Sequence, residues 1–526
     1  MDFIGTSGND TLNGTDKVDR FEMTQGGVDR VNGGGGSDFF YFGATLTADD
    51  RVNGGSDTRE DENLYLAGDY SAGLVLGANT VRNIDSIHLT SGYDYGLTLN
   101  DSNAAAGSVM NVKTYATVTV DGGGAGHSVR VDGSAEHDAV LMFHEGAPDS
   151  EFIGGSFGNV VHSYYGGHDI FRGGAGADSF YIHSGYDASD VILGGAGNDL
   201  LELHGEFSVG LISVNFTGTR LGGIENIVLS CDYHNSFRAV FSDAYAATGE
   251  VIHVGSLTRF SDAPETSVYI SASRETDASY AMSDGCGDDT LIGGGGNDEF
   301  SVVEGGLDHV QGRGGDDVIT FGKFANAGSI FNGGDGMDTL RAGVDAVLCV
   351  IDIAARVLTI NGEAAGRIGE VENAVGSGRN DRLFGNALDN DLRGGGAQDR
   401  ILGNDGDDRL HGDTGNDKLF GGAGADRLFG GDGLDRLDGG AGNDQFEGGA
   451  GSDIFVFARG GGVDTVTDFV DGEDILDLRT SPAGDFDDVR AHMAQVGADV
   501  VITYGSDSLV IAGASIDGFD AGDFML

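Results

Sequence analysis

The sequence predicts an all-β protein, a parallel β-roll or β-helix solenoid with a small C-terminal cap. Three observations lead to this fold class. Glycine-rich units of nine residues recur along the chain, short apolar-alternating segments lie between them, and helical spacing is clear in only one short segment. Short strands joined by tight turns are typical of solenoids, in which each coil buries its apolar residues against the next.

The composition predicts a cation as partner. The 526 residues include 95 Gly and 85 Asp plus Glu against 29 Lys plus Arg, which gives a formal charge of −56. Such a charge is typical of disorder, but 39% of the residues are hydrophobic, so the chain can bury a core once its acid is neutralised. Nucleic acid is not expected as a partner of so acidic a surface.

Other features limit the class of protein. Three scattered cysteines, Cys231, Cys286 and Cys349, fit neither a disulfide framework nor a zinc site, so we expect packed thiols. No apolar stretch is long enough for a transmembrane segment. The N-terminus lacks the basic and apolar regions of a signal peptide, so export would need another route.

The clearest periodicity runs from Gly376 to Val456 as nine consecutive nine-residue units. Position 1 is always Gly, and position 8 is always Leu, Ile or Phe. Position 6 is Asp in eight units, with Asn390 as the exception. These aspartates are Asp381, Asp399, Asp408, Asp417, Asp426, Asp435, Asp444 and Asp453.

Each residue type in the unit has a physical role. Glycine allows the tight turns that expose backbone carbonyls, and Asp adds an anionic oxygen. Oxygen ligands suit Ca²⁺, whereas Zn²⁺ would require the Cys or His that these turns lack. Positions 7 to 9 form a strand whose middle residue, such as Leu419, points inward. Stacked carboxylates would oppose this stacking without a cation, so the array predicts several bound Ca²⁺ ions.

The pattern G-G-x-G-x-D-x-U-x resembles the calcium-binding repeat of RTX (repeats-in-toxin) exoproteins. The resemblance implies that each ion is shared between one turn and the turn two repeats later, with the position-6 Asp as ligand. Arg379 and Leu388 replace Gly at position 4 of the two opening units, so we expect their sites to be weak or empty. The run from Gly403 is the safest binding region.

The unit recurs in islands outside the main array, which also include Asp29 and Asp308. The remaining island aspartates expected to bind metal are Asp10, Asp38, Asp169, Asp178, Asp199, Asp289, Asp298, Asp317 and Asp338. Between the islands lie two β-rich stretches that look like copies of each other. We therefore divide the chain into N-terminal repeats (1–53), a β-helix-like module ending in repeats (54–193), its second copy (194–341), a β-rich connector (342–375), the main β-roll (376–456) and a C-terminal cap (457–526).

The segment after the main array, from Gly462 to Leu478, resembles the C-terminal cap of serralysin-type RTX proteins. Phe486, Val489, Met493 and Val496 follow helical spacing behind Asp485, which predicts a helix. The chain ends Asp523-Phe524-Met525-Leu526, similar to the uncleaved type I secretion signal of RTX proteins. A final β-strand that closes the roll is the alternative, and both can hold together. The resemblance implies an extracellular protein exported by type I secretion machinery.

Catalytic motifs are not found. His144-Glu145-Gly146-Ala147-Pro148 has proline where the second His of H-E-x-x-H belongs, and Gly154-Gly155-Ser156-Phe157-Gly158 matches G-x-S-x-G but fits a repeat turn better. Scattered surface histidines are favoured over a groove for His127, His137, His144 and His253 near Asp132 or Asp138. Tyr93-Asp94-Tyr95 fits sugar contact and ladder stacking equally.

The sequence thus favours a secreted calcium-binding repeat protein whose folding is driven by extracellular Ca²⁺. Its role would be structural, as part of a surface layer or matrix, or adhesive, with self-assembly or extracellular polysaccharide as partners. The alternative is a polysaccharide-active enzyme of the lyase or epimerase type. The β-helix segments would then carry the site, and the RTX modules would serve export and stability.

Overall fold

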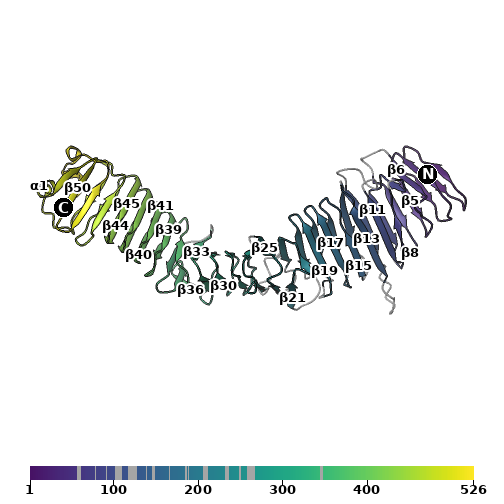
Figure 1. Cartoon of the computed structure of the whole chain (residues 1–526), viewed down its shortest axis with the longest axis horizontal. Helices are drawn as coiled ribbons and strands as arrows, with labels where there is room; N and C mark the ends of the chain where they lie inside the picture. Colours follow the sequence, from purple (N-terminus) through teal and green to yellow (C-terminus); the bar gives the residue numbers. More distant parts are fainter. Residues whose placement is uncertain are drawn as a thin grey trace. The chain divides into compact units, whose positions relative to one another are not determined.

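We describe the protein from a computed structural model. It describes residues 1–55, 61–77, 79–90, 92–100, 109–115, 127–137, 139–144, 149–164, 166–183, 186, 189–204, 211–230, 236–247, 250–257, 267–343 and 348–526. The chain divides into two compact units, Met1–Ala263 and Pro264–Leu526. In each unit the chain winds as a parallel β-solenoid, which confirms the predicted fold class (Figure 1). The six-segment division of the sequence stays a prediction.

One sheet of the first unit is a long parallel stack. It consists of β1 (Asp2–Ile4), β3 (Arg20–Glu22), β5 (Phe39–Phe42), β7 (Asn63–Leu66), β10 (Ser86–Thr90), β12 (Val109–Tyr115), β14 (Val140–His144), β16 (Val160–Ser163), β18 (Ser179–Ile182), β20 (Leu200–His204), β23 (Asn226–Ser230) and β25 (Val251–Leu257).

The other strands of the first unit form three further parallel groups. These are β2 (Thr11–Asn13), β4 (Arg30–Gly34), β6 (Arg51–Gly55) and β9 (Val81–Arg82); then β8 (Tyr70–Val75), β11 (Tyr95–Asn100), β13 (Ser128–Ala135), β15 (Asp149–Ile153), β17 (Ile170–Ala175), β19 (Val191–Ala196) and β22 (Leu221–Gly222); then β21 (Leu211–Phe216) and β24 (Ser236–Phe241).

The second unit has two sheets, on opposite sides of the roll. The first contains β27 (Ser279–Ser283), β29 (Glu299–Val302), β31 (Val318–Phe321), β33 (Thr339–Ala342), β37 (Asn373–Val375), β39 (Asp391–Gly396), β41 (Arg409–Thr414), β43 (Arg427–Asp432), β45 (Gln445–Ala450) and β47 (Val463–Val466), and ends in β51 (Asp507–Ile511), β50 (Asp499–Tyr504) and β49 (Met493–Val496).

The second sheet carries the alternate units of the repeat. It contains β26 (Val268–Ser271), β28 (Thr290–Ile292), β30 (His309–Gly314), β32 (Ile330–Asp335), the antiparallel β36 (Glu363–Gly369), β35 (Val357–Ile360) and β34 (Cys349–Asp352), and then β38 (Arg382–Phe384), β40 (Arg400–Asp405), β42 (Lys418–Ala423), β44 (Arg436–Ala441), β46 (Ile454–Val456), β48 (Ile475–Asp477) and β52 (Phe524–Met525).

The core is the inward ladder of position-8 residues. Leu410, Leu419, Leu428 and Leu437 are all 0% exposed, as are Phe446 and Phe455. Successive nonapeptides alternate between the two sheets, so a residue pairs with its counterpart 18 positions on, as Leu419 does with Leu437. Two units therefore complete one coil, and each coil buries an apolar residue from both sides.

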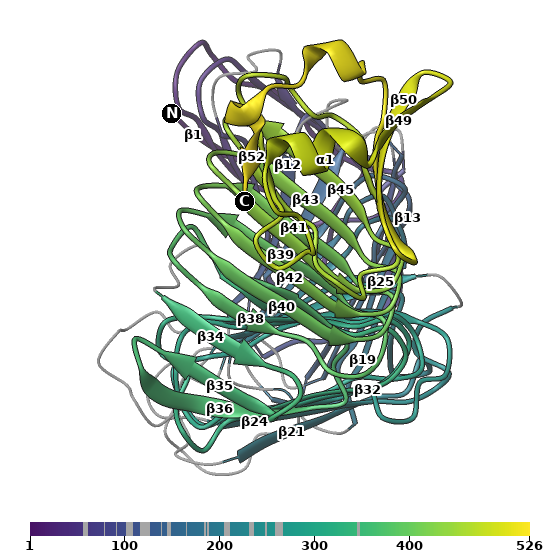
Figure 2. The same ribbon diagram turned by 90° about the vertical axis from the view of Figure 1, so that its left-hand side faces the viewer.

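The C-terminal cap differs in part from the prediction. Helix α1 spans only Phe486–Ala491, begins at Asp485, whose side chain accepts the Asp488 N–H, and is the α-helix of the described residues. The prediction that helical spacing continues through Met493 and Val496 is wrong: both lie in β49, antiparallel to β50. Gly497, with φ of 68°, makes the tight turn between these strands. Figure 2 shows α1 and this hairpin at the end of the roll.

The tail forms a strand as well. Phe524 of β52 pairs in parallel with Leu476 of β48, so the chain end closes one sheet of the roll. Cys349 is buried as a free thiol and Cys286 is partly buried, while the third cysteine lies outside the described residues. None of the helices in the described part of the chain has the length and apolar content that a membrane crossing requires.

Candidate calcium-binding turns

The repeat aspartates form a buried column of carboxylates beside the core. In the main array they are at most 3% exposed. One carboxylate oxygen, Oδ1, accepts the backbone N–H of the aspartate one coil earlier, at 2.7 Å from Asp381 to Asp399 and 2.7 Å from Asp399 to Asp417. This oxygen therefore links adjacent coils.

The second oxygen, Oδ2, separates two kinds of turn. In a first group it is buried and accepts no hydrogen bond from the described residues; we call these open turns. They contain Asp178, Asp199, Asp317, Asp338, Asp399, Asp408, Asp417, Asp426, Asp435, Asp444 and Asp453. A buried anionic oxygen without a partner is costly, so each open turn is short of one positive or donating group.

In the second group the turn closes on its own carboxylate. Oδ2 of Asp381 accepts the Ser377 N–H at 2.5 Å, and that of Asp298 accepts the Gly294 N–H at 2.7 Å. Asp10, Asp19 and Asp289 accept in the same way from the residue four positions earlier, and Asn390 does so through its amide oxygen. We call these closed turns.

The backbone at position 2 of the unit decides which kind of turn forms. Position 2 has a positive φ in every open turn, including the non-glycine residues Arg313 at 85°, Asn404 at 84° and Asp413 at 69°. The corresponding residues of the closed turns, such as Ser377 and Gly294, do not have a positive φ. Because φ sets the direction of the residue's own N–H, a positive value turns that N–H away from the downstream carboxylate. Position 2 then joins the strand ladder, as Asn404 does with Gly422.

The open turns present a second kind of oxygen beside the carboxylate. A Cβ built on Gly421 would lie 2.2 Å from Oδ2 of Asp426 and 2.6 Å from the carbonyl oxygen of Gly439. The same holds at Gly412, for Oδ2 of Asp417 at 2.5 Å and the Gly430 carbonyl oxygen at 2.4 Å. Only glycine fits at these places. The donor set, carboxylate plus carbonyl oxygens, fits the hard cation Ca²⁺.

The pKa values of the open-turn aspartates also favour a bound cation. Burial raises the pKa of Asp399 and Asp317 to about 8 and that of Asp426 to about 7, although hydrogen bonds from the backbone oppose the shift. Neighbouring aspartates add to the rise. Each raised pKa means that the fold disfavours the ionised carboxylate, which a bound cation would reverse.

The column continues beyond the nonapeptides through residues that the sequence analysis did not select. Glu62, Glu225 and Glu372 accept the N–H of Asp38, Asp199 and Asp338, and Asp464 and Asp474 accept those of Asp444 and Asp453. An acid directly before an apolar-alternating strand is the signal that could have found them. Asp38 and Asp169 occupy equivalent places, where their Oδ1 atoms accept the N–H groups of Asp19 and Ser150.

One further acidic cluster lies in the second unit. Ligand atoms of Asp284, Asp289 and Asp308 all lie within 4.8 Å of one another, and all three residues are buried. Asp284 takes the place of the position-1 glycine. Oδ2 of Asp289 is held by the Gly285 N–H and Oδ2 of Asp284 by the Glu304 N–H.

Four histidines stack on the first unit. The ring centroids of His144 and His162 are 5.0 Å apart, those of His162 and His183 5.9 Å, and those of His183 and His204 4.7 Å. Tyr181 stacks on His162 at 4.8 Å. Of this stack, only His144 was singled out from the sequence.

Other selected residues are dispersed. His127 lies 3.5 Å from Asp94, and the exposed His253 lies in β25. Tyr95 is buried with its hydroxyl bonded to backbone, whereas Tyr93 is 40% exposed. The segment Gly154–Gly158 forms the turn between β15 and β16. Residue 138 and residues 145–148 lie outside the described part of the chain.

The sequence matches the family model of the RTX calcium-binding nonapeptide repeat. The matched residues are 3–22, 23–44, 165–201, 284–305, 302–326, 375–410, 384–419, 402–437, 420–455 and 429–466. They include the open turns of the main array. RTX repeats are typical of secreted proteins.

Among the solved structures that match this chain is the extracellular lipase LipA from Serratia marcescens. The two are 18% identical over 50% of this chain and 45% of the lipase, with a TM-score of 0.20. The chain thus spans less than half the length of that lipase. A search of curated proteins gave no match. The repeat match and the β-solenoid together establish that the chain is an RTX β-roll protein with calcium-binding repeats.

Proposed function

We propose that this protein is an exported RTX protein that folds when extracellular Ca²⁺ enters its open turns. The Oδ2 atoms of the open-turn aspartates, together with turn carbonyl oxygens, would be the ligands. The observation that carries the proposal is the column of buried Oδ2 atoms without hydrogen-bond partners in the described structure. The proposed ligand set is narrower than the sequence expectation, because the carboxylates of Asp10, Asp289, Asp298 and Asp381 are already held by their own turns.

The charge of the chain supports calcium-driven folding. With a formal charge of −56, the calcium-free chain repels itself, and folding would bring the carboxylates into a buried column. Extracellular calcium modules bind with Kd of about 10⁻⁴ to 10⁻³ M, so such sites would be empty in the cytosol and filled outside. Binding energy then becomes folding energy.

The test is a calcium titration of the full chain. Circular dichroism in chelator is expected to show little β-structure, with a cooperative gain as calcium reaches millimolar levels. Equilibrium dialysis measures the ions bound per chain. A spectrum that does not change with calcium would contradict the proposal. Magnesium at the same ionic strength is the control, because its smaller, octahedral shell fits these turns poorly.

The role outside the cell that we propose is structural or adhesive, within a surface layer or matrix. Export through a type I system is supported by the resemblance of the C-terminal residues to such signals. Electron microscopy of the calcium-loaded protein tests this role. Ordered assemblies or adhesion to a surface support it, and dispersed monomers without adhesion would argue against it.

A polysaccharide-active enzyme is the second candidate, favoured by one observation. His144, His162, His183 and His204 share one face of the first unit with Tyr181 and Glu202, and Nε2 of His204 lies 2.9 Å from Oε1 of Glu202. Imidazole, phenol and carboxylate are groups that can exchange protons with a sugar ring. Incubation with acidic polysaccharides decides the matter: turnover that is lost in H183Q would support an enzyme, and no turnover would oppose it.

A further inference from the structure

A ladder of cations runs along one side of the main β-roll. Arg382, Arg400 and Lys418 hold position 7 of alternate units, and they pair in register across β38, β40 and β42. Their spacing is therefore that of adjacent strands, about 4.8 Å. All three side chains are exposed. In a chain with 29 basic and 85 acidic residues, three cations in direct register form an unusual concentration of positive charge.

These cations are not neutralised by neighbouring acids in the described structure. The ion pairs of this part of the chain involve other arginines, Arg393, Arg436 and Arg479. Arg400 instead lies over the ring of Phe420, 4.5 Å from its centroid. Like charges at strand spacing repel one another, so an anion along the ladder would be stabilising.

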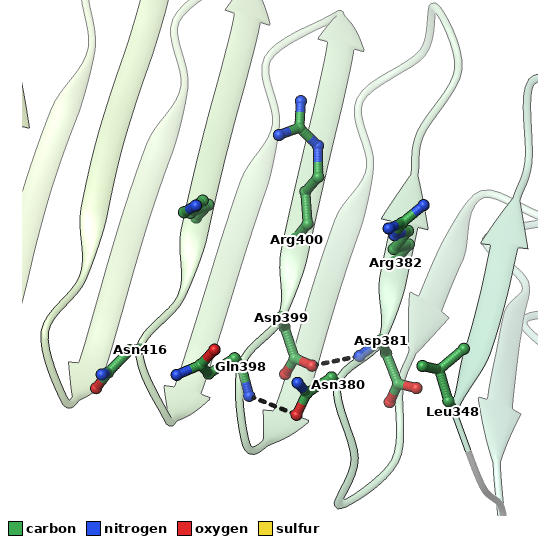
Figure 3. Close-up of a pocket in the computed structure, with 9 residues that line it drawn as sticks. Leu348, Asn380, Asp381, Arg382, Gln398, Asp399, Arg400 and Asn416 are labelled. Atoms are coloured by element: carbon green, nitrogen blue, oxygen red, sulfur yellow. Dashed lines mark hydrogen bonds between the residues drawn. The ribbon is translucent and has the colours of Figure 1, made fainter.

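The ladder borders a groove of about 410 Å³, lined also by Asn380, Gln398 and Asn416 (Figure 3). These residues form a second ladder, at position 5. The amide oxygen of Asn380 accepts the Gln398 N–H at 3.1 Å, and that of Asn416 accepts the Leu434 N–H at 3.0 Å. Their amide NH₂ groups remain to donate to a ligand. The carboxylates of Asp381 and Asp399 also line the groove but are buried.

A third row adds apolar contact beside the cations. Phe384, Leu402 and Phe420 at position 9 follow the same register and are partly exposed. The face thus offers three parallel rows with one amide donor, one cation and one apolar side chain for each coil. The repeat along the groove is one strand spacing, which is close to the length of a pyranose ring in a linear glycan.

We propose that this groove binds a linear acidic polysaccharide, with uronate carboxylates on Arg382, Arg400 and Lys418. The glycan carries one carboxylate for each sugar, and the groove offers one cation for each coil. The sugar hydroxyl groups would accept hydrogen bonds from the amide donors. The C–H faces of the sugars would pack on the apolar row. A single exposed ion pair contributes little, so binding requires an oligomer that spans several coils. The inference goes beyond the proposed calcium function and depends on it only through the folded roll.

Calcium strengthens this binding. The groove is part of a strongly acidic molecule, and ions in the neighbouring open turns remove negative charge close to Asp399. Because the contacts are exposed, added salt weakens the complex. A polymer of higher charge density, such as nucleic acid, gains less from one cation for each coil and is repelled more by the rest of the chain.

The experiment measures the affinity of a labelled oligogalacturonate for the calcium-loaded full chain. The fully methyl-esterified oligomer, which is neutral, is the ligand control. Short oligomers are used so that calcium does not gel the ligand. Replacing two groove cations in R400Q/K418Q is expected to weaken binding at least about tenfold, because several weak contacts act together. The matched variant R409Q/R427Q removes two cations in register on the opposite sheet and is expected to stay within about twofold.

Four results would overturn the inference. The first two are no binding of the uronate oligomer and equal binding of the neutral ester. The third is an equal loss in both double variants, which would indicate non-specific charge attraction, and the fourth is tighter binding of anionic phospholipid vesicles through the same two cations. Circular dichroism of the same samples reports the calcium response, so a failure of calcium-driven folding is distinguished from a failure of glycan binding.

Discussion

The backbone N–H of Asp399 donates a 2.7 Å hydrogen bond to Oδ1 of Asp417, while Oδ2 of Asp417 accepts none from the described residues. Oδ1 of this carboxylate thus links two neighbouring coils, whereas Oδ2 faces the turn.

The first prediction separates these two oxygens. In D417N the amide oxygen can still accept the Asp399 N–H, but the second position becomes an NH₂ group that cannot bind calcium. We expect the calcium concentration at half-folding to rise several-fold, because one ligand of a shared site is lost. The variant D381N, in a closed turn, loses an acceptor for the Ser377 N–H and is expected to destabilise the fold without removing a calcium ligand. Equilibrium dialysis at saturating calcium compares them: the number of ions bound per chain should fall in D417N and not in D381N, and an equal fall in both would contradict the division into open and closed turns.

The second prediction concerns the glycine at position 2. Gly422 has φ of +125°, and an added Cβ would lie 1.9 Å from the carbonyl oxygen of Asn404. We expect G422A to reduce the free energy of unfolding by at least about 2 kcal/mol, from backbone strain plus the clash. Gly378 has open space around its Cα, so G378A is expected to be nearly neutral. Denaturant unfolding in saturating calcium measures both. A neutral G422A would show that the turn does not need its positive φ.

The third prediction tests the inner ladder. Leu419 is 0% exposed and its truncation in L419A leaves a cavity between coils, which typically costs about 2–5 kcal/mol. Leu434, 56% exposed on the same roll, is the control, and L434A is expected to cost less than about 0.5 kcal/mol. Calcium-saturated thermal or denaturant unfolding distinguishes them. Similar costs for the two would mean that position 8 is not the core.

The fourth prediction is a pH dependence in the first unit. Burial lowers the pKa of His162, and the charges of His183 and His204 lower it further. The unfolded chain therefore binds a proton at this residue more readily than the folded one. The stability of this stack is present above the unfolded pKa of about 6.5 and is lost as pH falls below it. The protection factors of the amides in β16 and β18, which are exchange rates corrected for the intrinsic effect of pH, should fall as the pH drops from 7.5 to 5.5.

The control for this pH effect is a ring that cannot titrate. H162F keeps the stacked ring and is expected to flatten the pH dependence of exchange in β16 and β18. H253F, at an exposed position in β25, should leave it unchanged. If H162F exchanges with the same pH dependence as the parent chain, titration of His162 does not control this segment.

The repeat was enough to predict the solenoid, because a nine-residue period with an apolar position 8 allows few other folds. Leu419 and its counterparts are buried as the period requires. The closed turns could not be predicted in the same way. Gly293–Gly296 matches the repeat well, yet the turn of Asp298 is closed, whereas Arg313 departs from it and its turn is open. Open and closed turns therefore differ in the backbone φ angle at position 2 and not in the residue type found there.

The opening units illustrate the same point. From the sequence, weak or empty sites are expected there because Arg379 and Leu388 replace the position-4 glycine. In the structure, Ser377 and Asn386 at position 2 close those turns. The histidine stack was missed for another reason: its members are 18 to 21 residues apart, and only the coil length brings them together.

At position 6 the hydrogen bonds run from the amide of an earlier coil to the side chain of a later one, as from Asp399 to Asp417. At position 5 they run the other way, as from the Asp407 N–H to the carboxylate of Asp389. Asp444 and Asp453 find their acceptors in Asp464 and Asp474, which belong to the cap. At position 6, each coil is thus completed by its successor, and the last ones by the cap. Loss of the cap would therefore leave two buried backbone N–H groups of the roll without acceptors, which is costly.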